Sequence, residues 1–156
     1  SGLIAKKLAD VPRVLVASPG YLKRKGMPNH PDELADHDHV FFASTNRQTP
    51  LELIGPGGAV SRVKRSKGIA INSVRSAVRA VQEEAGIHAG PLWAFAPHIA
   101  RGDVVPILPD HSQMVLSLLA VRHPSAVVLA RISRFIEHAA ESVRAVEGLK
   151  AVGSKS

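Results

Sequence analysis

The chain has 156 residues, 45% of them hydrophobic and 21% charged, so it is long enough for one core and too short for two domains of ordinary size. It contains no cysteine, which excludes disulfides, thiolate zinc ligands and cysteine nucleophiles. No apolar run approaches the ~20 residues that span a bilayer, and the first residues do not resemble a signal peptide. We therefore expect a cytoplasmic protein with no membrane contact.

The net charge of +7 raises the question of nucleic-acid binding. However, the basic residues form short, scattered clusters, such as Lys23–Lys25 and Arg62–Lys67. Only 4% of the residues are aromatic, which leaves little material for stacking on bases. A basic surface that attracts small anions is at least as well supported.

Short apolar strands alternate with helical segments along the chain. Strands are predicted at Val14–Ala17, Val40–Ala43, Gly68–Ile71, Ile87–Pro91 and Val104–Leu108, with a glycine-rich hairpin of Leu51–Ile54 and Ala59–Arg65. Helices are predicted at Tyr21–Lys25, Ser73–Ala85 and Leu92–Arg101, with a helical first turn at Pro31. This alternation predicts an α/β domain with a partly parallel sheet.

Two further segments near the C-terminal end are strongly apolar. Val115–Val121 is apolar on both faces, which predicts a strand buried between helices. A final helix from about Ser125 to Val146 carries a wide apolar stripe that needs a partner layer. That stripe includes Val128, Leu129, Ile132, Phe135 and Ile136.

No catalytic or metal-binding constellation emerges from the residues. His37 and His39 lack any tetrahedral metal spacing, and we expect neither a metal nor another cofactor. Ser18 follows a strand but lacks the G-x-S-x-G frame of a nucleophile elbow. Asn72-Ser73 lies where a strand runs into a helix, a place that favours either an anion or simple helix capping, and capping is the stronger interpretation.

An ordered set of motifs is more specific than any one of them. It comprises Arg13-Val14-Leu15-Val16-Ala17-Ser18-Pro19-Gly20-Tyr21-Leu22, then Gly26-Met27-Pro28-Asn29-His30-Pro31-Asp32-Glu33-Leu34, Ile71-Asn72-Ser73, and Gly102-Asp103-Val104-Val105-Pro106-Ile107-Leu108-Pro109-Asp110. In order and spacing this set resembles the effector-binding domain of LysR-type transcriptional regulators, from Ser1 to about Arg144. One departure is Leu51-Glu52-Leu53, where the family often has Trp-x-Phe.

The resemblance implies a fold like that of type II periplasmic binding proteins, in which two α/β subdomains are joined by two crossing strands. The crossings are expected near Leu8–Val14 and Val115–Val121. Residues 1–12 and 122–156 would form part of the first subdomain and residues 13–121 the second, with the family's winged helix-turn-helix domain absent. The whole protein would bind DNA through that missing domain and act as a dimer or tetramer.

The resemblance also implies a non-enzymatic, effector-sensing role, with the effector in a cleft between the subdomains. The expected effector-binding residues are Phe42, Ala43, Ser44, Thr45, Asn72, Ser73 and Trp93. Free amides at the start of the helix after Ser73, together with the hydroxyl and amide side chains nearby, favour a small carboxylate. Two alternatives stay open: a solute-binding protein for uptake, and a small serine hydrolase that uses Ser18 or Ser73 with a histidine.

Overall fold

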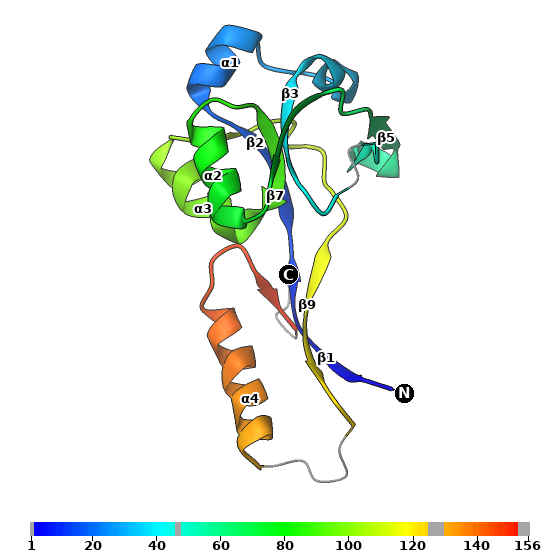
Figure 1. The fold of residues 1–156 in the computed structure, drawn as a ribbon, viewed down its shortest axis with the longest axis vertical. Helices are drawn as coiled ribbons and strands as arrows, with labels where there is room; N and C mark the ends of the chain where they lie inside the picture. The colour runs from blue at the N-terminus through cyan, green and yellow to red at the C-terminus, as the bar shows by residue number, and fades with distance from the viewer. Residues whose placement is uncertain (1, 46–47, 125–129, 153–156) are drawn as a thin grey trace.

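The computed structural model describes residues 2–45, 48–124 and 130–152. Its strands form two separate sheets, of five and three strands, and a two-stranded hairpin. Figure 1 shows the larger sheet with α1, α2 and α3 at one end of an elongated molecule, and β1, β9 and α4 at the other. The predicted mixture of strands and helices is confirmed.

The five-stranded sheet has the order β6-β3-β7-β2-β8. Its strands are β2 (Arg13–Ala17), β3 (Asp38–Phe42), β6 (Lys67–Ile71), β7 (Ile87–Pro91) and β8 (Val105–Pro106). β3 is parallel to β6 and β7, whereas β2 is antiparallel to β7 and β8. The sheet is therefore partly parallel, as the alternating pattern predicts, although the last strand is much shorter than Val104–Leu108.

Apolar side chains cover both faces of this sheet, because successive residues of a strand point to opposite sides. On one face, Val16 packs with residues of α2 (Val74–Gln82) and α3 (Leu92–Arg101), including Val81 and Phe95. On the other, Leu15 belongs to a cluster with α1 (Pro19–Lys25), the 3-10 helix η1 (Pro31–Asp36), and the hairpin of β4 (Leu51–Ile54) and β5 (Val60–Val63). A short 3-10 turn, η2 (Pro56–Gly58), connects the hairpin strands.

The three-stranded sheet has the order β10-β1-β9. β1 (Ile4–Val11) pairs antiparallel with β9 (Leu116–Arg122) along nearly its whole length, and β10 (Lys150–Ala151) pairs with the end of β1. The helix α4 (Ala130–Arg144) packs against β1. Because β1 runs through Pro12 into β2, one continuous stretch of chain joins the two sheets.

The predicted burial of Val115–Val121 is wrong. β9 forms as expected, but every residue of Val115–Leu119 is exposed, and Val121 is too. The reason is its position: β9 is the outermost strand of a three-stranded sheet, and in the described residues only α4 lies against that sheet, over β1. Of the apolar stripe of the final helix, Ile132 and Phe135 are exposed, whereas Val128 and Leu129 lie outside the described residues.

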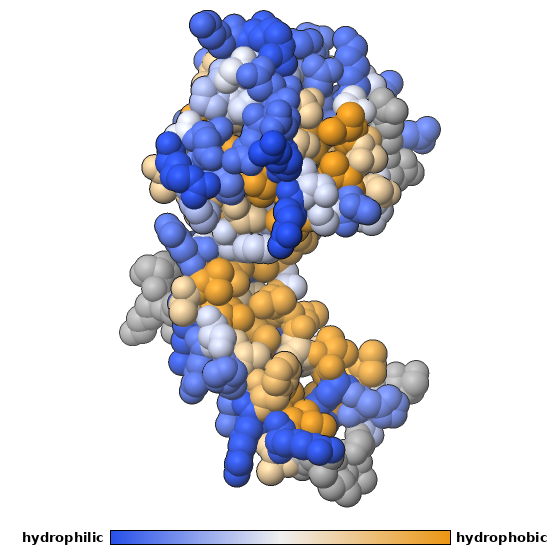
Figure 2. Space-filling model, turned by 60° about the vertical axis from the view of Figure 1, so that its left-hand side comes forward, coloured by the Kyte–Doolittle hydropathy of each residue, from blue (hydrophilic) through white to orange (hydrophobic). Residues whose placement is uncertain are grey.

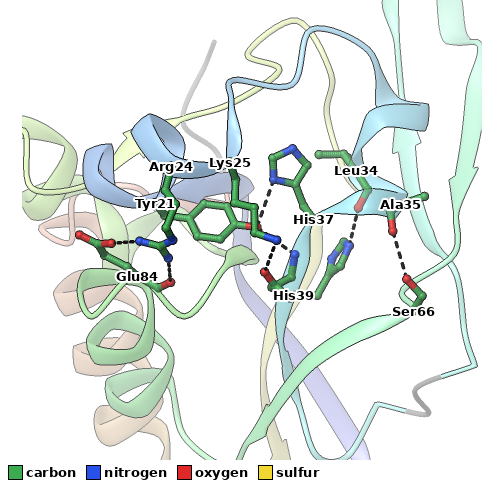
Figure 3. Close-up of polar contacts among 10 residues, drawn as sticks. Tyr21, Arg24, Lys25, Leu34, Ala35, His37, His39, Ser66 and Glu84 are labelled. Carbon is green, nitrogen blue, oxygen red and sulfur yellow. Dashed lines mark hydrogen bonds and ion pairs between the residues drawn. The ribbon is translucent and has the colours of Figure 1, made fainter.

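Buried polar contacts fix β3 to α1 and η1 (Figure 3). The backbone N–H of Asp38 donates to the Tyr21 hydroxyl at 2.9 Å, and that hydroxyl lies 3.1 Å from Nδ1 of His37. His39 Nε2 donates to the carbonyl of Leu34 at 2.8 Å. The two histidines of the His-Asp-His segment therefore hold different partners. Among the described residues, no group of three or more potential ligands is placed to hold a metal ion.

None of the helices in the described ranges is both long and apolar enough to cross a membrane.

Candidate effector site

The carboxyl ends of the parallel strands β3 and β6 lie side by side. Phe42 is in register with Ile71, and the backbone N–H of Ala43 donates to the Ile71 carbonyl at 2.7 Å. The residues that follow each strand, Ala43–Thr45 and Asn72-Ser73, therefore leave the sheet at the same edge. The structure brings these two predicted site segments together, as expected for the ends of neighbouring parallel strands.

Ser73 is the N-cap of α2. Its hydroxyl accepts a hydrogen bond from the Ser76 backbone N–H at 3.1 Å and lies 2.8 Å from the Ser76 hydroxyl. Ser73 and Asn72 are both exposed. The capping role that the sequence favours is confirmed, and it engages the Ser73 hydroxyl locally.

A cavity of about 330 Å³ lies between the five-stranded sheet and the β4–β5 hairpin. Phe42 and Thr45 line it, whereas Ala43, Ser44, Asn72 and Ser73 do not. The other lining residues come from β2, β3, β4, β7 and nearby loops: Arg13, His39, Val40, Phe41, Thr49, Pro50, Leu51, Glu52, Arg65, His88, Ala89 and Met114. Two of the seven predicted effector residues thus belong to this cavity.

Trp93 lies elsewhere. It is 40% exposed at the start of α3 and lines an outer groove with Val74, Val78 and Pro97, between α2 and α3. It does not line the cavity that holds Phe42 and Thr45. The sequence predicts that this tryptophan lines the effector pocket. In the structure it lines a different groove on the outside of the domain.

Two arginines in the cavity are absent from the sequence-based site. Arg13 Nη2 donates to the Ala89 carbonyl at 2.7 Å, so its guanidinium lies against β7. Arg65 follows β5, donates to the Thr49 carbonyl at 2.5 Å, and lies over the Phe41 ring with Cζ 5.6 Å from the centroid. Arg13 could have been predicted as a site residue, because it is a cation at the start of an otherwise apolar strand. Nothing in the local sequence distinguishes Arg65 from its basic neighbours.

Burial changes the ionisation of the groups around this cavity. Burial lowers the pKa of Arg13, and the positive charge of Arg65 lowers it further. Burial also lowers the pKa of His39, and it lowers the pKa of His88 to about 4. At neutral pH the two histidines are therefore uncharged, while both arginines keep their charge because the guanidinium pKa is so high.

The hydrolase alternative gains no support from the two serines. Ser18 is buried, and its hydroxyl accepts from the Tyr21 backbone N–H as the N-cap of α1. Ser73 bonds only within the first turn of α2. In residues 2–45, 48–124 and 130–152, no hydrogen bond joins either serine to a histidine, although a serine nucleophile needs such a base.

The family model that describes the LysR substrate binding domain matches residues 1–144. Because this match covers most of the chain, the protein belongs to the LysR family of transcriptional regulators, and the described portion has the architecture of the effector-binding domain. The resemblance carried by the ordered motifs is confirmed.

Two curated relatives from Escherichia coli K12 are similar in sequence. The chain is 30% identical to the HTH-type transcriptional activator AaeR over 111 residues, which cover 71% of this chain and 36% of AaeR. It is 27% identical to the HTH-type transcriptional activator TtdR over 121 residues, which cover 78% of this chain and 39% of TtdR. The chain therefore spans less than half the length of these relatives.

Solved structures give the same fold. The regulatory domain of CrgA, a LysR-type transcriptional regulator from Neisseria meningitidis, matches with a TM-score of 0.78 and 25% identity, over 91% of this chain and 69% of that one. The regulatory domain of AphB from Vibrio vulnificus matches with a TM-score of 0.69 and 28% identity, over 88% and 68%. These matches confirm the predicted fold of the type II periplasmic-binding-protein kind.

Proposed function

We propose that this domain senses a small organic anion in the cavity between the five-stranded sheet and the hairpin. The observation that carries the proposal is Arg13, a partly buried cation that lines the cavity and forms no ion pair among the described residues. A cation in such a place favours an anionic ligand, because the ligand replaces the lost hydration. Apolar walls from Phe41, Phe42 and Leu51 suit the carbon skeleton of a metabolite.

The position of the cavity supports a link between binding and the arrangement of the two sheets. Arg13 directly follows Pro12, where the chain passes from one sheet to the other, and Met114 lies just before β9, where it returns. Figure 2 shows the surface hollowed between the two ends of the molecule. A ligand that prefers one arrangement of the sheets shifts the population toward it.

The subdomain division and the behaviour of the whole protein belong to the same proposal. We place β1, β10 and α4 in one effector subdomain and the five-stranded sheet in the other, and we move β9 from the second subdomain, where the sequence puts it, to the first, because it pairs with β1 along most of its length. In a whole, cytoplasmic regulator, the change in arrangement would alter the geometry of a DNA-bound oligomer. Ala43, Ser44, Asn72 and Ser73, at the shared edge of β3 and β6, would contact the part of the ligand that projects from the cavity.

The experiment is a calorimetric titration of the chain with small carboxylates, using benzoate and butyrate as probes. Arg13→Lys keeps the charge but loses the forked donor geometry, and we expect it to weaken binding less than Arg13→Gln does. Lys64→Gln removes one positive charge from an exposed position near Arg65 and serves as the matched control. If Lys64→Gln weakens binding as much as Arg13→Gln, only the overall charge attracts the anion, and the proposed site is wrong.

A further inference from the structure

Two arginines from different parts of the fold, Arg13 and Arg65, line the same small cavity. Arg13 is held on β2, in the sheet, by its bond to the Ala89 carbonyl. Arg65 is held after β5, at the base of the hairpin, by its bond to the Thr49 carbonyl and by its contact with the Phe41 ring. Each of these contacts is with a neutral carbonyl or ring, so it positions the guanidinium without itself neutralising the charge.

The cavity carries more positive than negative charge. Glu52 is the only carboxylate that lines it in the part of the chain that the structure describes, and Oε1 of Glu52 accepts from Nε of Arg62 at 2.7 Å on the exposed side of the hairpin. His39 and His88 also line it, but burial lowers the pKa of each, so neither adds or removes charge at neutral pH. The positive charge of Arg65 disfavours the charge of Arg13, a repulsion that anionic groups between them would relieve.

We propose that the effector carries two anionic groups and is a small dicarboxylate, with one carboxylate bound by Arg13 and the other by Arg65. Its carbon skeleton lies against Phe41, Phe42 and Leu51, which form the apolar part of the wall. Arginine binds a carboxylate through two parallel N–H donors, so two fixed arginines select both the number of carboxylates and the distance between them. This inference rests on the proposed function, because it names the ligand class of the same cavity.

The choice of a dicarboxylate has a structural consequence. Arg13 belongs to the strand that begins directly after the crossing at Pro12, whereas Arg65 lies two residues after the hairpin strand β5. A ligand with two carboxylates would therefore tie the hairpin to the sheet next to the crossing.

The test compares acids matched in carbon skeleton, titrated into the 156-residue chain at constant ionic strength. The pairs are succinate against butyrate and terephthalate against benzoate. We expect a dicarboxylate to bind about tenfold or more tightly than its matched monocarboxylate, because its second carboxylate gains a charge-assisted bond. In Arg13→Gln and in Arg65→Gln this preference should fall to near unity, while Lys64→Gln should keep it.

The possible outcomes separate this inference from the proposed function. If monocarboxylates bind as tightly as their matched dicarboxylates, and Arg13→Gln weakens both, the dicarboxylate inference is wrong and the proposed function stands. If no acid of either kind binds, the proposed function fails as well. If Arg65→Gln fails to fold, Arg65→Lys, which keeps the charge, takes its place. Arg65→Lys should retain only part of the preference for dicarboxylates over monocarboxylates. An unchanged preference would overturn the role of Arg65.

Discussion

Nδ1 of His88 donates a hydrogen bond to the backbone carbonyl of Val40, 2.8 Å away. The bond joins β7 to β3 inside the five-stranded sheet, and the imidazole is 2% exposed between the rings of Phe42 and Phe95. Nε2 of the same ring is buried without a hydrogen-bond partner among the described residues. The site thus suits a neutral imidazole, which donates through one nitrogen only.

The burial of His88 predicts a loss of stability in mild acid. Its pKa is lowered from 6.5 to about 4, so the unfolded chain binds a proton more readily than the folded one between these values. Stability should therefore be highest above pH 6.5 and fall as the pH decreases toward 4, by about 3 kcal/mol from this residue. His37 and His39, whose pKa values are also lowered by burial, act in the same direction.

Urea denaturation at several pH values between 7.5 and 4 measures this effect. His88→Gln should flatten part of the dependence, although it lowers stability at pH 7.5 by removing packed ring atoms. A stability that stays constant from pH 7 to 4.5 would contradict the assignment of a buried neutral imidazole.

Removal of the Tyr21 hydroxyl should destabilise the link between α1 and β3. Tyr21→Phe leaves the Asp38 backbone N–H and the His37 ring without this partner, in surroundings where Tyr21 is fully buried. We expect a loss of about 1–3 kcal/mol in the free energy of unfolding. Asn29→Ala removes an exposed side-chain bond to the Met27 carbonyl and should cost far less. Equal losses for the two variants would contradict the prediction.

Removal of the cap of α2 tests whether Ser73 serves only the stability of the helix or also binds the effector. Ser73→Ala removes the acceptor for the Ser76 backbone N–H and should cost about 1 kcal/mol of stability. If Ser73 and Asn72 contact the ligand, Ser73→Ala and Asn72→Ala should weaken carboxylate binding by more than this loss explains. Calorimetry on both variants decides the matter, since an affinity equal to that of the wild type would remove these residues from the site.

The exposed apolar surface of β9 and α4 should cause self-association of the 156-residue chain. Phe135 is 70% exposed, and Leu116, Leu119 and Val121 are about half exposed on the outermost strand. Figure 2 shows hydrophobic residues gathered along this end of the molecule. Such surfaces, and unpaired strand edges in particular, favour association.

Sedimentation at increasing protein concentration measures this association. Leu119→Ser combined with Phe135→Ser should shift the distribution toward monomer. Val60→Ser, an exposed valine on the distant hairpin, should leave it unchanged. A wild-type chain that stays monomeric at high concentration would contradict the prediction.

DNA binding by this chain alone should be weak and independent of sequence. The net charge of +7 attracts phosphates, but such binding releases counterions and therefore falls steeply with salt. Fluorescence anisotropy with two unrelated duplexes, at low and physiological salt, should give similar affinities that decline together. Tight binding to one duplex at physiological salt would mean that the chain itself reads DNA sequence.

Local sequence patterns located most of the elements of the larger sheet, and the motifs identified the family. Apolar runs bounded by Pro, Gly and Ser located β2, β3 and β7, and Gly26, Ser73 and Gly102 marked helix ends correctly, because turn and cap preferences act between neighbours in the chain. The ordered motifs gave the LysR family and, through it, the fold. The same local signals placed Phe42 and Thr45 at a strand end that proved to border the cavity.

Which side chains share that cavity, and which strands are covered, depends on packing between segments that are distant in the sequence. Arg13 and Arg65 lie far apart in the sequence, and they meet because the hairpin folds back over the sheet face that carries Arg13. Trp93 turned to an outer groove, since the helical register of α3 buries Phe95 instead. β9 is exposed despite its apolar sequence, because burial depends on what packs against a strand, and hydropathy reports only the preference of the strand itself.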